Sequence, residues 1–339
     1  MTTKGNCVGG GVVKRIFEHS FDDIILIENL LETWEIFLRG KRHKKDVMDF
    51  QLKLFDNLVL LSNDLRHKVY YHKQYQAFNI SDPKPRRIHK ASVRDRIVHQ
   101  LVYNTLYDYF DRQFIYDSYS CRKKKGAHKA LNRFKYFAGK VSYNHTRTCH
   151  VLKCDVKKFF ANIDQVILFG ILKRQIADID LLWLIQKVLS SFWTVRQGVG
   201  LPLGNLTSQL FSNIYLNELD KYVKQELRVK YYIRYADDFV ILSDDKEYLK
   251  NILEKIDIFL KTKLKLTLHP NKVFIRTYSS GIDFLGWVHF PYYRQIRTTT
   301  RYRVKRGLTG WPKPETINSY RGLLSHGNTY DFRKSLGLG

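Results

Sequence analysis

The chain has 339 residues, 44% of them hydrophobic and 27% charged, a composition typical of a folded protein with one large or several small lobes. It carries 58 Lys or Arg against 32 Asp or Glu, and a net charge of +26 indicates a polyanionic partner. We find no apolar run long enough to span a membrane and no signal or lipidation pattern, so the sequence favours nucleic acid over a membrane surface.

Residues 1–20 predict a flexible leader. The glycines 9–11 have no strand before them and no Gly-Lys-Ser/Thr after them, which argues against a nucleotide-binding loop. Between residues 24 and 65, apolar side chains recur at helical spacing and predict two helices. The basic connector Arg39–Lys45 between them is either a solvated loop or a phosphate contact.

The next segments predict strands and then a helix. Residues 69–90 are predicted to form strands interrupted at Asp82–Pro85, because proline lacks the backbone N–H that pairs strands and favours a turn. Residues 92–113 return to helical periodicity, and the basic cluster Arg122–Lys125 follows. Near the C-terminus, after two prolines, residues 315–336 predict a short helical pair.

The segment His150–Val156 predicts a strand that ends in an acid. Because side chains alternate along a strand, the face that carries Leu152 should pack inward, whereas Asp155 takes the opposite face. A helix-capping role for Asp155 is the alternative. Asp164, which directly precedes the helical segment 165–176, suits that role better.

The cysteines indicate a reducing, cytoplasmic setting, because the four of them include no CxxC pair and no disulfide spacing. Cys149, His150 and Cys154 lie near one another and raise the question of a metal site. No second ligand pair follows, so we expect buried thiols on a strand.

The segment Tyr231–Leu242 predicts a tight hairpin, with the adjacent acids Asp237 and Asp238 at its turn. Neighbouring carboxylates repel each other, and Asn-Gly or Asp-Gly would serve a simple turn better. A divalent cation would remove the repulsion and explain the pair.

One acid on a strand and two on a hairpin suit phosphoryl transfer. Two cations about 3.5–4 Å apart stabilise the attacking and leaving oxygens of an in-line displacement. Mg²⁺, with Mn²⁺ as the alternative, prefers carboxylate oxygens and leaves positions open for phosphate. We expect two ions at Asp155, the adjacent Val156, Asp237 and Asp238. Asp237 should bridge them beside Asp155, and Asp238 should be peripheral.

At Tyr235-Ala-Asp-Asp238 the sequence resembles the reverse transcriptase family, and further family motifs follow in order. The resemblance runs from about residue 80 to residue 290. Its segments are Lys84-Pro-Arg86, Arg94–Val98, Tyr119–Arg122, Asp155–Ile163, Gly200–Gln209, Leu266–Lys272 and Phe284-Leu-Gly286. It implies an RNA-directed DNA polymerase whose partners are template RNA, the RNA/cDNA duplex and deoxynucleoside triphosphates.

The fold implied by the resemblance is α+β, a right-hand polymerase with fingers, palm and thumb. N-terminal helices and fingers would occupy residues 21–150. The palm, with an antiparallel sheet, would occupy residues 151–290 and include the nucleotide-site motif 198–209 and the catalytic hairpin 231–242. A short basic helical thumb would occupy residues 291–339. We recognise no appended endonuclease, maturase-like or RNase H domain.

Two motif positions differ from most of the family and indicate a narrower group within it. Ser208-Gln209 stands where bacterial intron and retron enzymes usually have Ser-Pro, and Leu203 stands where many, though not the retron group, have Gln. This pattern resembles the reverse transcriptases of diversity-generating retroelements. Such enzymes copy a template-repeat RNA with frequent errors at adenines and work with a small accessory variability protein. The N-terminal helices and Arg39–Lys45 are candidate docking surfaces for that protein.

The resemblance also assigns roles to single residues. Phe159 and Phe160 would contact the incoming nucleotide. Phe160 would pack against its sugar, with core packing beside Phe159 as the alternative. Lys272 would donate a proton to the leaving pyrophosphate, with a solvated lysine as the alternative. Asn205 or Thr207 should cap the following helix. The other expected nucleotide contacts are Lys84, Arg86, Leu203, Gly204 and Gln209, and the expected template–primer contacts are Arg122, Lys123, Gly286, Arg297, Arg301 and Arg303.

Two rival interpretations remain. One is a retron or group II-intron type of reverse transcriptase, including defence-associated forms. The Ser208-Gln209 pair and the compact C-terminus distinguish this chain from that type. The other is a non-catalytic RNA-binding maturase. A pure binding protein would not need three mutually repulsive carboxylates, so the sequence favours an enzyme.

Overall fold

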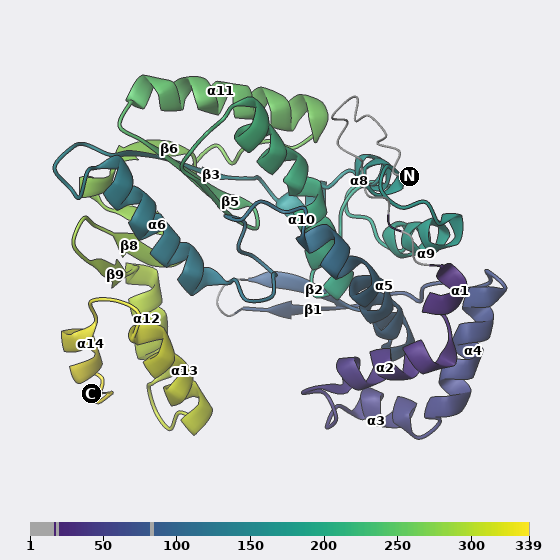
Figure 1. Ribbon diagram of the computed structural model, residues 1–339. Coiled ribbons are helices and arrows are strands. Elements are labelled where there is room, and N and C mark those ends of the chain that lie inside the picture. Colours follow the sequence, from purple (N-terminus) through teal and green to yellow (C-terminus); the bar gives the residue numbers. More distant parts are fainter. Residues whose placement is uncertain (1–16, 18–19, 82–84, 339) are drawn as a thin grey trace, which may run out of the picture.

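The computed structural model describes residue 17 and residues 20–81 and 85–338, which are arranged around a central antiparallel sheet (Figure 1). The helices are α1 (Phe21–Ile24), α2 (Ile27–Leu38), α3 (Lys45–Gln51), α4 (Leu54–Arg66), α5 (Val93–Asp111), α6 (Ala127–Val141), α7 (Phe159–Asn162), α8 (Gln165–Lys173), α9 (Ile179–Ser190), α10 (Leu206–Lys221), α11 (Lys246–Lys263), α12 (Thr298–Gly307), α13 (Pro314–Leu324) and α14 (Tyr330–Lys334). The strands are β1 (Gln76–Ile80), β2 (Arg86–Lys90), β3 (His150–Asp155), β4 (Tyr232–Tyr235), β5 (Asp238–Ser243), β6 (Phe274–Thr277), β7 (Ile282–Phe284), β8 (Trp287–His289) and β9 (Arg294–Ile296).

The helical periodicity predicted between residues 24 and 65 is confirmed, but the second of the two expected helices is divided into α3 and α4. Trp34 of α2 is buried, and its ring stacks on Phe50 of α3 with the centroids 5.4 Å apart. The expected leader lies largely outside the described residues. Phe17, however, is buried, and its N–H donates to the Gln175 carbonyl at 2.9 Å. The chain is therefore anchored three residues before the expected end of the leader.

The strands predicted before α5 form the β1–β2 hairpin, in which Gln76 pairs with Lys90. The described residues 69–75, which we expected to form a strand, precede the hairpin and are in no strand. Residues 82–84, including the predicted nucleotide contact Lys84, lie outside the described residues. The helix predicted at 92–113 is confirmed as α5.

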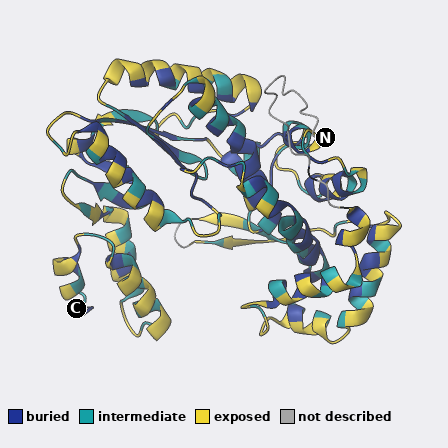
Figure 2. Cartoon of the chain, in the orientation of Figure 1, coloured by how far each residue is buried: buried dark blue, intermediate teal, exposed yellow. Residues whose placement is uncertain are grey.

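The central sheet has the order β4-β5-β3-β6, and every neighbouring pair is antiparallel. Leu152 and Cys154 of β3 lie in the same hydrophobic cluster as the buried side chains of α10 and α11. Val151 packs in a second cluster with Phe134 of α6. Figure 2 shows α10 almost wholly buried and α6 with one buried side. Both faces of β3 are therefore packed, whereas the sequence led us to expect packing on one.

A second sheet, β7-β8-β9, leads into the C-terminal helices. Its first hairpin turns at Leu285 and Gly286, which have φ values of 51° and 87°, as a two-residue turn of this kind requires. Trp287 pairs with Ile296, so this sheet continues past residue 290, where we expected the palm to end. Helices α13 and α14 confirm the predicted helical pair. The observed architecture is the expected α+β class.

Cys149 and Cys154 are buried beside and on β3, as predicted. Burial raises the pKa of the Cys149 thiol to about 12, so this thiol stays protonated near neutral pH. No helix in the described part of the chain combines the length and apolarity needed to cross a bilayer.

Candidate active site

Asp155 and Asp238 stand opposite each other at one end of the central sheet, as register partners on β3 and β5. Asp237 occupies the two-residue turn between β4 and β5, after Ala236, whose φ is 54°. The Val156 N–H donates to the Asp237 carbonyl at 3.3 Å and joins this turn to the end of β3. The fold therefore brings the three predicted carboxylates to one place.

These carboxylates repel one another in a partly buried site. Burial raises the pKa of Asp238 to about 7, and the charges of Asp155 and Asp237 add to the rise. Burial also raises the pKa of Asp237, again with a contribution from Asp155. The Oδ1 atom of Asp238 is buried without a hydrogen-bond partner among the described residues. A bound cation would favour the charged form of both groups.

Two lysines partly balance these acids. Lys272 Nζ lies 3.1 and 3.2 Å from the two carboxylate oxygens of Asp155. Lys153, which is buried, lies 3.4 Å from Asp238 and donates to the Asp283 carbonyl at 2.7 Å. The structure thus places the predicted Lys272 at the site. Our reading of the sequence missed Lys153, although strand alternation puts it on the same face of β3 as Asp155.

A buried ion pair fixes the base of the hairpin. Arg234 of β4 and Asp220 of α10 are fully buried, with nitrogen–oxygen distances of 2.7 and 2.5 Å. The Arg234 guanidinium also donates to Asn213 Oδ1 at 3.2 Å and to the Ala236 carbonyl at 3.1 Å. Since Ala236 precedes Asp237, this cluster holds the turn that carries the acid. No spacing rule relates a strand residue to its partner on the preceding helix, so the sequence did not reveal the pair.

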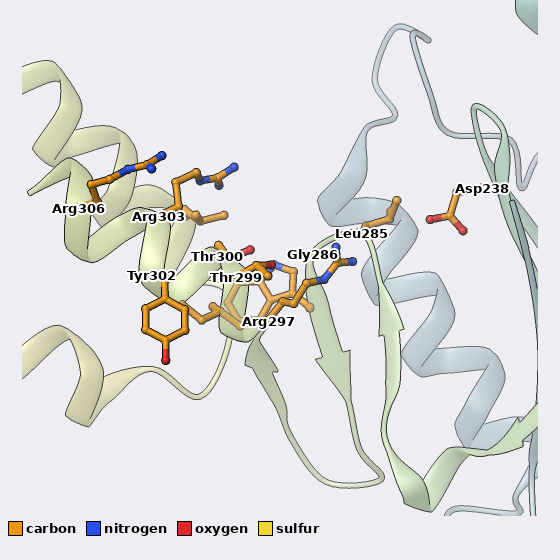
Figure 3. Close-up of a pocket in the computed structure, with 12 residues that line it drawn as sticks. Asp238, Leu285, Gly286, Arg297, Thr299, Thr300, Tyr302, Arg303 and Arg306 are labelled. Atoms are coloured by element: carbon orange, nitrogen blue, oxygen red, sulfur yellow. The ribbon is translucent and has the colours of Figure 1, made fainter. Parts of the chain in front are cut away.

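A groove of about 750 Å³ opens beside Asp238 (Figure 3). Figure 3 shows Asp238 on one side of it and Arg303 and Arg306 of α12 on the other. Arg297 lies between them and forms an ion pair with Asp283. The groove is lined by Asp238, Leu285, Gly286, Trp287, Ile296, Arg297, Thr299, Thr300, Tyr302, Arg303, Arg306 and Leu323. Guanidinium groups along a groove suit a phosphate backbone.

Three of the predicted template–primer residues, Gly286, Arg297 and Arg303, line this groove. Arg301 points elsewhere, because its guanidinium lies over the ring of Phe332, 4.9 Å from the centroid. Arg301 therefore packs α14 against α12, and as an exposed residue outside this groove it stays a predicted template–primer contact.

Arg122 is a structural residue rather than the predicted template contact. Its guanidinium donates to the Asp111 carboxylate at 2.7 Å and to the carbonyls of Ile115 and Ser118 at 2.7 and 3.0 Å. Only 7% of its side chain is exposed, so these donors are not free for a phosphate. The neighbouring Lys123 is largely exposed and stays a predicted contact.

The segment that precedes α10 packs on the β1–β2 hairpin. Gly204 has a φ of 106°, and a Cβ there would lie 2.7 Å from Ile88 Cγ2, so the position requires glycine. The Leu203 carbonyl accepts the His89 N–H at 2.9 Å, and Asn205 Nδ2 donates to the His89 carbonyl at 3.0 Å. Asn205 thus bonds β2, and the prediction that its side chain caps α10 is wrong.

Thr207, the other expected cap, bonds His99 Nδ1 of α5 at 2.6 Å instead. Gln209 is exposed near the start of α10. Asp164 does cap α8 as predicted, because its carboxylate accepts the N–H groups of Val166 and Ile167 at 3.0 Å each.

The two phenylalanines differ in exposure. Phe159 is buried in the core, which gives it a packing role in place of the predicted nucleotide contact. Phe160 is only partly buried, and its carbonyl accepts the Leu201 N–H at 2.8 Å, which joins it to the segment before α10. Arg86, at the start of β2, is exposed, and its charge opposes the rise in the pKa of Asp237, so it stays a predicted nucleotide contact.

The donor set fits a hard divalent cation, although no group of three or more His, Cys, Asp or Glu side chains in the described ranges is already arranged around a metal position. Asp155, Asp237 and Asp238 offer oxygen donors only, as Mg²⁺ prefers. Two of them have raised pKa values, and Asp238 has an unpaired buried oxygen. Lys272 forms an ion pair with Asp155.

Residues 79–289 match the family described as "Reverse transcriptase (RNA-dependent DNA polymerase)". The chain is 26% identical over 284 residues to protein YkfC of Escherichia coli K12, with 72% of each chain covered. It is 24% identical over 340 residues to the group II intron-encoded protein LtrA of Lactococcus lactis subsp. cremoris, covering 79% of this chain and 54% of LtrA. A solved structure of apo telomerase from Candida tropicalis, truncated from the C-terminal domain, matches with a TM-score of 0.49 and 13% identity, covering 71% of this chain and 60% of that one.

Proposed function

The chain belongs to the reverse transcriptase family of RNA-directed DNA polymerases, and we propose that it copies the template-repeat RNA of a diversity-generating retroelement by two-metal nucleotidyl transfer. The observation that carries the proposed chemistry is the pairing of Asp155 with Asp238 across β3 and β5, with Asp237 at the adjoining turn. The groove that begins at Asp238 and continues along the arginines of α12 supports a template–primer duplex as the substrate.

Each residue of the site has a defined task in this proposal. Two divalent cations, Mg²⁺ or Mn²⁺, would stabilise the attacking and leaving oxygens when bound. Asp155, Val156 and Asp237 would hold them, with Asp238 more peripheral beside Lys153. Lys272, now paired with Asp155, would donate a proton to the leaving pyrophosphate.

The assignment to a diversity-generating element rests on Leu203 and on Ser208-Gln209. Leu203 is half-buried where the segment before α10 meets β2, and Gln209 is exposed on the first turns of α10. The accessory protein of such elements would dock on the N-terminal helices. Exposed apolar side chains of α3 and α4, Met48 at 53% and Phe55 at 63%, follow the basic connector Arg39–Lys45 in the chain and support that surface.

The second candidate is a group II-intron type of reverse transcriptase, which the similarity to LtrA favours. Sequencing of cDNA made by the purified chain with candidate RNA and Mg²⁺ distinguishes the two. We expect misincorporation to concentrate opposite template adenines. Errors spread evenly over the four template bases would reject the diversity-generating assignment and leave the polymerase assignment intact.

Leu203→Gln is expected to reduce errors opposite adenine. A glutamine here could hydrogen-bond near the nascent base pair, which leucine cannot do. One such buried contact is worth about 1–3 kcal/mol, which corresponds to roughly one to two decades of discrimination. Leu203→Met, which has a similar volume but no amide, is the matched control and should keep the wild-type error rate. Equal error rates in the glutamine and methionine variants would contradict the prediction.

Phe160→Ala is expected to admit ribonucleotides, because Phe160 is proposed to fill the space of a 2′-hydroxyl. Forcing extra atoms into a filled site costs about 1–3 kcal/mol, so discrimination against ribonucleotides should fall roughly ten- to a hundredfold. Primer extension with NTPs and dNTPs measures this ratio. Phe160→Tyr keeps the ring and should keep the exclusion. Unchanged exclusion in the alanine variant would return Phe160 to ordinary packing.

A further inference from the structure

A long segment of the chain is basic without any acid. Residues 118–154 contain ten Lys or Arg and no Asp or Glu. This segment includes α6, which covers one face of the central sheet. Lys153 balances Asp238 at the catalytic site, and Arg122 pairs with Asp111. The groove beside Asp238 is lined by residues of other segments, so the catalytic site does not account for the remaining charges.

Helix α6 has one apolar and one basic side. Leu131, Phe134 and Phe137 are buried against the sheet in the second hydrophobic cluster. Lys135 and Lys140 are exposed on the other side. A helix normally presents both charge signs to solvent, because oppositely charged neighbours stabilise it. Helix α6 itself contains no acid, and its Arg133 pairs with Asp117 outside the helix. The exposed lysines on this side indicate an anionic partner.

Aromatic side chains alternate with these cations. Tyr116, Tyr136 and Tyr143 are 70%, 52% and 59% exposed. Lys125 Nζ lies 3.5 Å from the ring centroid of Tyr116, and the Arg133 guanidinium lies 5.3 Å from that of Tyr136. Exposed rings held by neighbouring cations offer flat faces on which a base can stack.

Two adjacent hollows of about 480 Å³ each lie along this side of α6. They share Asn132 and Tyr136, so Tyr136 stands between them. Lys129 lines the first hollow and Lys140 the second. Among the described residues that line either hollow, none is Asp or Glu. The hollows therefore form one continuous basic and aromatic strip, which we call the α6 strip.

We propose that the α6 strip binds an unpaired stretch of RNA outside the catalytic groove. Cations that follow a line, with aromatic rings between them, are the arrangement by which proteins hold a single strand without reading its sequence. From Lys129 to Lys140 the helix rises about 16 Å, the length of roughly five nucleotides whose bases keep the stacked spacing of about 3.4 Å each. The inference rests on the proposed function in one respect only. It assumes that the unpaired RNA is a part of the template that has not yet been copied.

Binding of a fluorescent single-stranded RNA of about 20 nucleotides, measured by anisotropy over a series of salt concentrations, tests the proposal. Lys135→Gln with Lys140→Gln removes two phosphate contacts and should make the log–log salt slope shallower by about 1.4. Tyr136→Ala removes one stacking platform and should weaken binding about fivefold or more. Glutamine is as good a helix former as lysine, so the double variant should fold.

The matched control is Lys255→Gln with Lys263→Gln on α11, which packs on the opposite face of the central sheet and exposes both lysines. This variant should bind the single strand as the wild type does. Equal losses in the two double variants would mean that net charge alone matters and would overturn the proposal. Wild-type binding by the α6 variants, or equal loss of affinity for a blunt RNA duplex, would overturn it as well.

The outcome is independent of catalysis, because binding is measured without nucleotides. Primer extension on a short template, just long enough to fill the catalytic groove, should be unchanged in the α6 variants. Normal extension with weakened single-strand binding supports the proposal. Absence of cDNA synthesis by the wild-type chain would reject the proposed function and leave the binding result standing.

Discussion

Asp237→Asn is expected to abolish DNA synthesis while leaving RNA binding nearly unchanged. The substitution removes a carboxylate that is proposed to hold both cations, and cation stabilisation of the transition state is worth several kcal/mol. A loss of about 4 kcal/mol lowers the rate roughly a thousandfold. Asp155→Asn should have the same effect. RNA affinity depends on the basic surface and should persist, with its steep salt dependence. Primer extension and anisotropy measure the two quantities.

The stability of the variant separates this result from misfolding. Burial and the nearby Asp155 raise the pKa of Asp237, so its charged form is disfavoured in the metal-free protein. A neutral amide of the same shape removes that repulsion, and the melting temperature without metal should be equal or higher. Asp244→Asn, an exposed acid after the far end of β5, is the matched control and should retain full activity. Near-normal synthesis by Asp237→Asn would exclude the proposed site.

The catalytic strand and hairpin could be predicted because their signals are local. Alternation along residues 150–156 placed Asp155 at a strand end, and two β-rich arms around Ala-Asp-Asp placed Asp237 and Asp238 at a turn. Both elements are present, and β3 and β5 lie side by side in the sheet. The acids converge because antiparallel pairing of these strands aligns their ends, which local pattern alone does not specify.

The predictions that proved wrong concern side chains whose hydrogen-bond partners the local sequence pattern does not specify. Asn205 and Thr207 have cap-forming side chains, but they bond His89 on β2 and His99 on α5. Arg122 lies in a basic run, yet its guanidinium donates hydrogen bonds to Asp111 and to the Ile115 carbonyl. In each case the residue type suggested a common role, and tertiary contacts supplied a different one.

Asp220→Leu is expected to destabilise the fold by about 3–5 kcal/mol, because it leaves the fully buried Arg234 guanidinium without its counter-charge. Tyr232 would also lose its acceptor, since its hydroxyl donates to Asp220 at 2.8 Å. Urea unfolding should show a correspondingly lower midpoint with an unchanged slope. Arg234→Met should be destabilising for the converse reason, as it leaves a buried carboxylate whose remaining donor is neutral.

The double variant Asp220→Leu with Arg234→Met tests whether the cost comes from the unpaired charge. Two apolar side chains of suitable volume avoid burying any charge, so the double variant should be more stable than either single one. It should nevertheless synthesise DNA poorly, because Arg234 also donates to the Ala236 carbonyl at 3.1 Å and fixes the turn before Asp237. Recovered stability with reduced synthesis would show that the pair orients the hairpin. Recovery of both stability and DNA synthesis would show that Arg234 acts only in folding.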